Sequence, residues 1–345
     1  MARREEHTVE IGVVGAGAWG TALAMAAMRA GKRVRLWARD PAHAEAIAAS
    51  GANGRYLAGI GLHPLPPVTA ELADLEGADA LILAVPAQSL AEVSVRLPAC
   101  EAIVIAAKGL ESGSGRRLTE VVAAGRPEAR LAVLSGPSFA VEVARDQPCA
   151  LVLACADGAL GRRLAEALTT PRFRLYWTDD VTGVEVGGAL KNVLAIAAGI
   201  ADGMDLGDNA RAALVTRGLA ELARLGAAMG ARTETMMGLS GLGDLILTST
   251  SGKSRNYRLG RSIGEQRGLG TSLSRPDALA EGVWTAQAAL RVAGERGLDL
   301  PISRAVAAIL AGEIGVDAAM EQLLLRPPRP EPEGHGRDGG RPQAG

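Results

Sequence analysis

VEIGVVGAGAWG, which spans residues 9–20, decides how the rest of this chain is organised. The first half of this stretch is apolar enough for a short strand, and residues 21–30 continue as a helix. Between the two stand Gly15, Gly17 and Gly20 in the spacing G-x-G-x-x-G. A strand, these glycines and a helix, in this order, are typical of a turn that binds a dinucleotide.

Each of the three glycines has a physical reason in such a turn. Gly15 permits the tight turn, Gly17 lets the backbone approach a pyrophosphate, and Gly20 lets the helix pack close to the strand. The phosphates would then meet backbone N–H groups at the positive end of the helix dipole. A purely structural turn, which needs no ligand, is the alternative.

Apolar runs and helical segments alternate through the first half of the chain. This pattern predicts an α/β, Rossmann-like domain over residues 9–180, with a mostly parallel sheet covered on both faces. Ligands of such sheets bind at the carboxyl ends of the strands. Further strands are expected at residues 32–38, 79–85, 102–107, 131–134, 149–154 and 173–177, and helices at 41–50, 88–97 and 159–168.

The pattern changes after residue 180. Segments of helical length and spacing, without a convincing strand, predict an all-α domain over residues 181–325. Residues 1–8 are polar and residues 326–345 are rich in proline, glycine and charge, so we expect a flexible tail and a disordered tail. The principal helices are expected at residues 184–200, 210–229 and 285–296.

Composition excludes several classes of protein. The 37 basic and 38 acidic residues nearly balance, which argues against a nucleic-acid partner held by a broad basic surface. No apolar run reaches the length of a membrane span, and the N-terminus lacks the apolar core of a signal peptide. Cys100, Cys149 and Cys155 are scattered, which indicates reduced thiols and a cytoplasmic protein. The histidines have no metal-ligand spacing, so no structural metal is expected.

Arg39 and Asp40 follow the expected second strand, where the adenosine ribose of a dinucleotide is recognised. An acidic residue there favours NAD, whereas a basic one accommodates the 2′-phosphate of NADP. Because Arg39 comes first, we expect NADPH to be accepted, without excluding NADH. An ordinary solvated charge is the alternative for Arg39.

Only four of the 37 basic residues are lysines. Arginine keeps its proton at any working pH, so lysines beside or inside apolar segments, here Lys108 and Lys191, are candidates for proton transfer. Gly187 and Gly188 lie one turn before Lys191, and small apolar surroundings would lower the pKa of its ammonium group. A surface lysine that extends its ammonium group to solvent is the alternative.

Two further segments carry polar groups suited to a ligand. Asp244, between glycines and an apolar run, fits either a helix cap or a carboxylate that orients a neighbouring lysine or hydroxyl. Residues 251–261, SGKSRNYRLGR, combine guanidinium and amide donors that suit a phosphate. A solvated basic loop explains the second segment equally well.

Seven segments, in order along the chain, together resemble the bacterial-type NAD(P)-dependent glycerol-3-phosphate dehydrogenase family. They span most of residues 9–285, and the ordered set is far more specific than any one of them. The segments are GAGAWGTALA at 15–24, AAKGLE at 106–111, SGPSFA at 135–140, ALKNVLAIAAGIADG at 189–203, GLGDLILT at 241–248, SRN at 254–256 and AEG at 280–282.

The resemblance implies a role for each matching residue. Lys191 matches the general acid/base of the family, with Lys108 and Asp244 completing the catalytic group. The implied substrate contacts are Lys108, Gly136, Ser138, Lys191, Asp244, Ser254, Arg255 and Asn256. The implied cofactor contacts, beside the three glycines, are Ala18, Trp19, Arg39, Lys108, Ala140, Arg255, Leu279 and Glu281.

The implied reaction is the reversible reduction of dihydroxyacetone phosphate to sn-glycerol 3-phosphate with NADPH or NADH, which supplies a glycerophospholipid precursor. The implied partner is this small phosphorylated substrate, and a homodimer is compatible with the apolar helical domain. The chain departs from the family at Ala18, where serine is frequent, and at Lys253, in the loop before SRN. The role of Lys253 is left open.

Two other functions remain as alternatives. A different two-domain Rossmann dehydrogenase would act on a hydroxyacid and would need a carboxylate-binding group in place of the SRN segment. A non-catalytic dinucleotide sensor would bind NADPH without turnover and would not need Lys191.

Overall fold

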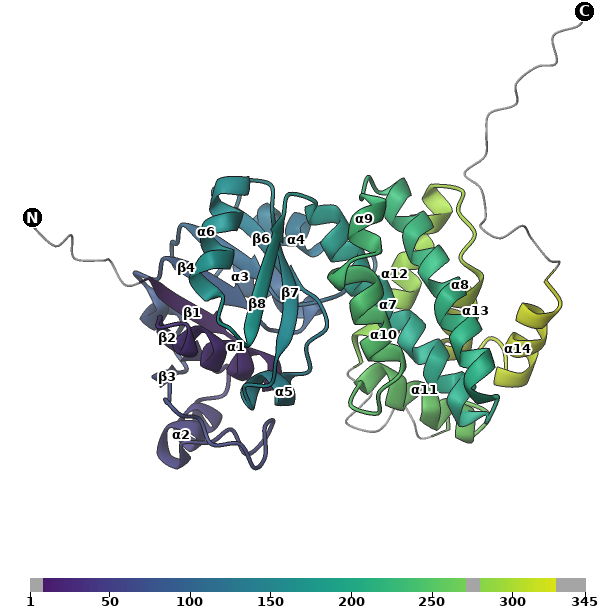
Figure 1. Cartoon of the computed structure of the whole chain (residues 1–345), viewed down its shortest axis with the longest axis horizontal. Helices are drawn as coiled ribbons and strands as arrows, with labels where there is room; N and C mark the ends of the chain where they lie inside the picture. Colours follow the sequence, from purple (N-terminus) through teal and green to yellow (C-terminus); the bar gives the residue numbers. More distant parts are fainter. Residues whose placement is uncertain (1–8, 271–279, 327–345) are drawn as a thin grey trace, which may run out of the picture.

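The computed structural model describes residues 9–270 and 280–326 and shows two lobes lying side by side (Figure 1). A sheet lobe contains the described residues up to 180, and a helical lobe contains those that follow. The predicted tails at residues 1–8 and 326–345 lie outside the described residues, apart from Arg326.

The sheet lobe is built on one eight-stranded sheet of order β3-β2-β1-β4-β5-β6-β7-β8. All neighbouring strands are parallel except β6 and β7, which are antiparallel. The carboxyl ends of β1, β4, β5 and β6 therefore meet at one edge of the sheet. The strands are β1 (Glu10–Val14), β2 (Arg33–Trp37), β3 (Val68–Thr69), β4 (Ala80–Leu83), β5 (Ala102–Ile105), β6 (Arg130–Ser135), β7 (Cys149–Cys155) and β8 (Phe173–Thr178).

Helices cover both faces of this sheet because successive strand residues point to opposite sides. Val13 belongs to the apolar cluster on one face, together with Leu23 of α1, whereas Val14 belongs to the cluster on the other face, together with Leu90 of α3. The helices are α1 (Ala18–Arg29), α2 (Pro41–Ser50), α3 (Leu90–Ser94), α4 (Leu118–Gly125), α5 (Ala140–Ala144) and α6 (Gly158–Leu168), with 3₁₀ turns η1 (Leu72–Leu75) and η2 (Ala87–Ser89).

Several local predictions for this lobe were wrong in detail. The first helix begins at Ala18 rather than at residue 21, because Gly17 is already its N-cap. The helix predicted at 88–97 is a 3₁₀ turn followed by the five residues of α3. The short elements β3, α4 and α5 were not predicted, since their apolar patterns are too brief to show a period.

The helical lobe contains only helices and connections among its described residues, as the sequence predicted. Its centre is α7, which packs against α8, α10, α11 and α12. The helices are α7 (Val181–Gly203), α8 (Gly207–Ala228), α9 (Thr233–Met236), α10 (Asp244–Ser249), α11 (Arg255–Glu265), α12 (Glu281–Glu295), α13 (Pro301–Leu310) and α14 (Val316–Leu324), and a π-helical turn η3 (Leu239–Gly243) precedes α10.

Helix α7 bears on the expectation that no apolar run reaches the length of a membrane span. By length and composition it could cross a membrane, since its most apolar 18-residue window has a mean hydropathy of 1.5. That window is fully buried within the structure. The helix is therefore the core of the helical lobe, and its apolar character reflects packing on all sides.

The contact between α7 and α11 is unusually close. A Cβ atom at Gly199 would lie 2.1 Å from the carbonyl oxygen of Tyr257, and one at Gly260 would lie 2.0 Å from that of Ile196. Only glycine permits this approach at either position. The pairing holds the start of α11 in a defined place beside α7, which carries Lys191.

Candidate active site

The glycine turn after β1 has the geometry of a dinucleotide cradle. Gly15 has φ +117°, and a Cβ atom on it would lie 2.8 Å from the carbonyl oxygen of Ala84. A Cβ atom on Gly20 would lie 1.8 Å from the carbonyl oxygen of Gly15, so α1 packs against the turn through this position. At Gly17 a Cβ atom would meet nothing within 4 Å, which leaves open space at the start of α1. The three glycines thus fit a pyrophosphate at the helix N-terminus.

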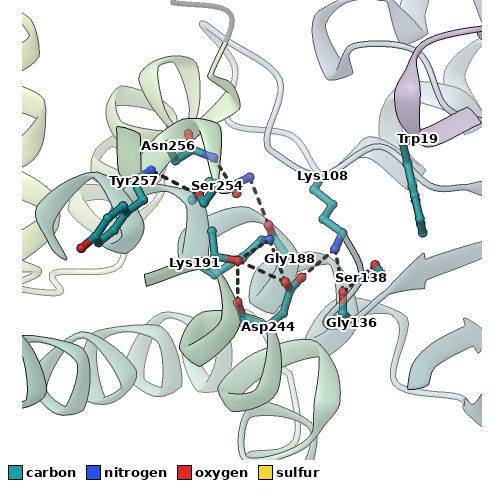
Figure 2. A network of polar contacts seen from close by, with 12 residues as sticks. Trp19, Lys108, Gly136, Ser138, Gly188, Lys191, Asp244, Ser254, Asn256 and Tyr257 are labelled. Atoms are coloured by element: carbon teal, nitrogen blue, oxygen red, sulfur yellow. Dashed lines mark hydrogen bonds and ion pairs between the residues drawn. The ribbon is translucent and has the colours of Figure 1, made fainter. Parts of the chain in front are cut away.

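Trp19 links this turn to the next part of the site. Its indole Nε1 donates to the carbonyl oxygen of Ala106, 3.2 Å away. Ala106 follows β5 directly and stands two residues before Lys108. The indole therefore lies on the same side of the site as the Lys108 side chain (Figure 2).

Arg39 and Asp40 stand at the end of β2 but have different surroundings. The Asp40 carboxylate caps α2, accepting from the backbone N–H of Ala42 at 3.1 Å, and lies 3.4 Å from the Arg55 guanidinium. Both residues are exposed. The Asp40 carboxylate is thus engaged in the helix cap and in an ion pair at the surface, and Arg39 lies beside it.

A buried carboxylate held between two lysines forms the centre of the candidate site (Figure 2). Lys191 Nζ lies 2.8 Å from Asp244 Oδ1, and Lys108 Nζ lies 2.6 Å from Asp244 Oδ2. Lys191 also donates to Thr248 Oγ1 at 2.9 Å, and Lys108 donates to the carbonyl oxygen of Gly136 at 3.0 Å. The structure thus brings together Lys108, Gly136, Lys191 and Asp244, which the sequence had singled out from four separate segments.

Burial sets the electrostatics of this network. Lys191 is 7% exposed and Asp244 is 1% exposed. Desolvation lowers the pKa of Lys191 to about 8; the Asp244 carboxylate opposes this shift and the Lys108 ammonium group adds to it. Burial alone would raise the pKa of Asp244, but the two ammonium groups outweigh it and lower that pKa below its usual value. The site therefore holds an ionised carboxylate and an ammonium group whose pKa, at about 8, is well below that of an exposed lysine.

Local sequence explains how Lys191 and Asp244 reach each other. A Cβ atom on Gly187 would lie 2.7 Å from the carbonyl oxygen of Ser240, so α7 packs directly on the turn η3 that precedes Asp244. Gly187, one of the two glycines before Lys191, thus permits the close approach of another backbone. Asp244 is the first residue of α10, with Gly243 as the N-cap. Two roles were predicted for Asp244, a helix cap or a carboxylate beside a lysine. Its contact with Lys191 agrees with the second.

Thr248 was missed by the sequence reasoning. Its hydroxyl accepts from Lys191 and donates to the carbonyl oxygen of Asp244 at 2.6 Å. The available signal was spacing, because a residue four positions after Asp244 on a helix lies on the same face.

The turn after β6 lies beside Lys108. Gly136 has φ +140°, and a Cβ atom on it would lie 2.9 Å from the Cα of Leu151. Its carbonyl oxygen accepts from both Lys108 and the Ser138 hydroxyl, the latter at 3.0 Å. Ala140 then begins α5. The predicted residues of this turn are thus gathered at the carboxyl end of β6.

The three residues of the segment SRN, at 254–256, have different surroundings. The Ser254 hydroxyl caps α11 by accepting from the backbone N–H of Tyr257 at 3.2 Å. The Asn256 amide donates to Asn192 Oδ1 at 2.9 Å and accepts from the backbone N–H of Gly282 at 3.0 Å. Both side chains are therefore engaged within the helical lobe, whereas Arg255 is exposed at the first position of α11.

Glu281 connects the helical lobe to the sheet lobe. Its Oε1 accepts from the backbone N–H of Ala87 at 3.2 Å, just after the carboxyl end of β4. Burial raises the pKa of Glu281, and the nearby Arg255 guanidinium partly offsets this. The other predicted cofactor contact of this region, Leu279, lies outside the described residues. Within residues 9–270 and 280–326, no group of three or more His, Cys, Asp or Glu side chains could hold a metal ion.

Two family models cover most of the chain. The model of the NAD-dependent glycerol-3-phosphate dehydrogenase N-terminus matches residues 10–160, and that of the C-terminus matches residues 180–321. The chain belongs to the NAD-dependent glycerol-3-phosphate dehydrogenase family. Its two lobes correspond to the two halves that these models describe.

Individual relatives agree with the family models. The chain is 53% identical over 326 residues to glycerol-3-phosphate dehydrogenase [NAD(P)+] of Rhodospirillum rubrum, covering 93% of each chain. It is 50% identical to the protein of that name from Caulobacter vibrioides, covering 93% of this chain and 98% of that protein. The crystal structure of glycerol-3-phosphate dehydrogenase from Coxiella burnetii matches with a TM-score of 0.87 and 38% identity, covering 92% of this chain and 99% of that one.

These matches confirm the predicted family and the predicted fold class. They also confirm the predicted enzyme class and cofactors: the chain is an oxidoreductase that uses NAD(P) and reduces dihydroxyacetone phosphate to glycerol 3-phosphate. The roles of single residues stay predictions.

Proposed function

We propose that Lys191 is the general acid and base of this reaction, with Asp244 and Lys108 as its partners. The observation that carries the proposal is the network Lys108–Asp244–Lys191, in which one buried carboxylate lies between two ammonium groups. When bound, NAD(P)H supplies the hydride that reaches C2 of dihydroxyacetone phosphate. The chain has to supply a proton to the C2 oxygen, stabilise its charge and hold the phosphate.

Lys191 provides the proton. With a pKa of about 8, its ammonium group is mostly protonated at neutral pH yet gives up its proton readily to a developing alkoxide. In the oxidation direction the neutral amine takes the proton back from the C2 hydroxyl. An arginine could not alternate between these two forms, because its pKa is too high.

Lys108 and Asp244 set the conditions for this transfer. Lys108, whose side chain is 16% exposed, stands on the opposite side of Asp244 from Lys191 and would stabilise the charge that develops on the substrate oxygen. Asp244 holds both lysines in place and keeps the pKa of Lys191 from falling further. Gly136 and Ser138 complete the substrate contacts, beside Lys108.

The substrate phosphate would bind at the start of α11. Arg255 offers an exposed guanidinium there, and the helix N-terminus offers backbone N–H groups and the positive end of its dipole. Ser254 caps this helix, and Asn256 ties it to α7 through Asn192. These two residues would contribute chiefly by holding Arg255 toward the phosphate.

The cofactor would lie across the glycine turn and the carboxyl ends of the strands. Arg39 is proposed to accept the 2′-phosphate of NADPH, because Asp40 is engaged in capping α2. Arg255 is proposed to contact both ligands. The proposed cofactor contacts are Gly15, Gly17, Ala18, Trp19, Gly20, Arg39, Lys108, Ala140, Arg255, Leu279 and Glu281.

We further propose the domain bounds, the oligomeric state and the location that the sequence suggested. Residues 9–180 would form the cofactor-binding domain and residues 181–325 the substrate domain, flanked by tails at 1–8 and 326–345. A homodimer and a cytoplasmic location fit the apolar helical lobe and the free cysteines. The product would serve as a glycerophospholipid precursor.

A substrate panel tests the proposed phosphate site. Oxidation of NADPH and NADH would be measured with dihydroxyacetone phosphate, with unphosphorylated dihydroxyacetone and with a 2-keto acid. We expect rapid oxidation with the phosphate ester alone, and Arg255→Gln should raise its KM while Arg162→Gln, on the distant helix α6, should not. Equal rates with dihydroxyacetone would contradict the phosphate site. NADPH binding without any turnover would favour a sensor.

A further inference from the structure

Lys253 makes a contact between the two lobes that the reaction does not explain. It lies in the loop between α10 and α11, in the helical lobe. Its Nζ is 2.5 Å from Glu142 Oε1 and 6.0 Å from the ring centroid of Phe139. Phe139 and Glu142 stand at the start of α5, in the sheet lobe. One side chain thus combines an ion pair with a cation–π contact across the lobes.

The backbone around Lys253 is braced from its own side. The N–H of Lys253 donates to Ser251 Oγ at 3.2 Å. Arg258 Nη1 donates to the carbonyl oxygens of Gly252 and Lys253, at 2.9 and 3.1 Å. The loop therefore presents the Lys253 side chain to α5 from a defined position.

The residues on either side of this contact belong to the proposed site. Lys253 immediately precedes Ser254 and Arg255, at the proposed phosphate end. Phe139 follows Ser138 in the turn that accepts the Lys108 hydrogen bond. The contact of Lys253 with α5 therefore joins the segment that carries Arg255 to the turn that carries Ser138.

We propose that Lys253, Glu142 and Phe139 form a clasp, and that Lys253 is a positioning residue which holds the phosphate-binding segment against the turn after β6. This inference rests on the proposed function of Arg255. Lys253 does not touch the reacting atoms. The clasp favours the closed arrangement in which Arg255 and Lys108 contact one substrate molecule, so it acts on substrate affinity rather than on the chemical step.

The clasp is weak enough to open in each catalytic cycle. The side chains of Lys253 and Glu142 are 59% and 31% exposed, so water and salt screen their attraction. Ion pairs of this kind change an equilibrium by about two- to fivefold. A clasp of that strength shifts the balance toward closure without trapping the product.

Steady-state kinetics of single variants test the clasp. Lys253→Gln and Glu142→Gln should each raise the KM for dihydroxyacetone phosphate about two- to fivefold, with kcat unchanged within twofold. The matched control is Arg162→Gln, which breaks an exposed pair of 2.9 Å with Glu166 within α6. High salt should raise the KM of the parent enzyme toward that of the variants. A parent-like KM in both variants, or a loss confined to kcat, would overturn the proposal.

The double variants show whether the two side chains act together. Lys253→Gln with Glu142→Gln should raise KM no more than either change alone, because the same contact is lost once. The exchange Lys253→Glu with Glu142→Lys should lower KM below that of each of its two single changes. It should stop short of the parent value, since a carboxylate over the Phe139 ring loses the cation–π contact. Additive effects would overturn the clasp.

A second measurement is independent of the substrate. Amide hydrogen exchange across residues 251–258, with NADPH bound, should be about two- to fivefold faster in Lys253→Gln and in Glu142→Gln than in the parent. Arg162→Gln should leave this segment unchanged. Unaltered exchange would overturn the clasp even in an enzyme that reduces dihydroxyacetone phosphate. Faster exchange without any turnover would leave the clasp in place and contradict the proposed function instead.

Discussion

Asp244 and Glu221 are both carboxylates buried in the helical lobe, each 1% exposed, and their surroundings are of opposite kinds. Asp244 lies between the ammonium groups of Lys108 and Lys191. Glu221, on α8, accepts from the backbone N–H groups of Ile302 and Ser303, at 2.5 and 3.1 Å, and from the Ser303 hydroxyl at 2.8 Å. One carboxylate organises side chains that can carry protons, and the other caps the start of α13.

The difference shows that burial alone does not mark a carboxylate as a candidate catalytic group. Burial raises the pKa of Glu221, and its hydrogen bonds only partly offset that shift. The pKa of Asp244 is lowered in spite of burial, because two cations face it. A perturbed group points to function when its partners are themselves titratable and lie where a ligand can reach them. The hydrogen-bond donors around Glu221 are two backbone N–H groups and the Ser303 hydroxyl, which do not titrate in the working pH range, so we expect Glu221 to act on stability.

The largest effect is expected from removing the proton donor. Lys191→Met keeps an unbranched apolar side chain in place of the buried stem but removes the proton. Turnover with dihydroxyacetone phosphate should fall by about 10²–10⁴-fold. Binding of NADPH, followed by fluorescence titration, should persist, because the glycine turn lies in the other lobe. Turnover close to that of the parent would remove Lys191 from the mechanism.

The pH dependence of the parent enzyme belongs to the same prediction. Reduction requires protonated Lys191, so kcat/KM for dihydroxyacetone phosphate should decline as the pH rises through about 8. Oxidation of glycerol 3-phosphate requires the neutral amine and should increase over the same range. A reduction rate that stays constant through this range would contradict the assignment.

Asp244→Asn sharpens the comparison by removing one charge and little volume. The Asp244 carboxylate raises the pKa of Lys191, so its loss should lower that pKa below about 8. The alkaline decline of the reduction rate should therefore move to lower pH. The measurement is kcat/KM against pH for the parent and the variant. A decline that stays in place would mean that burial alone sets the titration of Lys191.

Glu221→Ala should separate stability from activity. The change leaves the buried N–H groups of Ile302 and Ser303 without their acceptor, which costs about 1–3 kcal/mol. Denaturant unfolding should show this loss, while kcat at room temperature stays that of the parent because the hydrogen bonds of Glu221 go to the start of α13 and not to the lysine network. A loss of kcat equal to that of Asp244→Asn would abolish the distinction between the two carboxylates.

The sequence predicted the architecture of the sheet lobe well, because its strands are apolar runs that end at polar or glycine-rich turns. The runs at 79–85, 102–107 and 131–134 coincide with β4, β5 and β6, longer or shorter at their ends by a few residues. The antiparallel direction of β7 was not predictable, since strand direction depends on pairing across the sheet. The two-residue β3 is too short to carry a period.

The candidate site was predictable residue by residue but not as a network. Local patterns singled out Lys108, Lys191 and Asp244, and the resemblance supplied their joint role in one catalytic group. Nothing in the sequence indicates that Lys108 and Asp244, 136 positions apart, share an ion pair. Asn256 was expected to face a phosphate, and the structure shows it bonded inside the helical lobe. Glu221 gave no signal, because a glutamate on an amphipathic helix normally faces water.

The smallest expected effect is the pH dependence of stability. As the pH rises, the contribution of Glu221 to stability should fall and that of Asp244 should grow. The folded protein holds the proton of Glu221 more tightly than the unfolded chain, so this group's contribution to stability is present at acidic pH and is lost as the pH rises through its raised pKa. Asp244, with a lowered pKa, contributes above its unfolded value and loses that contribution as the pH falls. The slope from one proton cannot exceed about 1.4 kcal/mol per pH unit.

Free energies of unfolding measured in mildly acidic and in neutral buffer, for the parent, Glu221→Gln and Asp244→Asn, test this opposition. The cost of Glu221→Gln should shrink from acidic to neutral pH, and the cost of Asp244→Asn should grow. If both costs change in the same direction, the lysines do not hold the charge on Asp244 in the folded protein. The two carboxylates would then be equivalent buried acids, and the case for Asp244 as the centre of the site would rest on position alone.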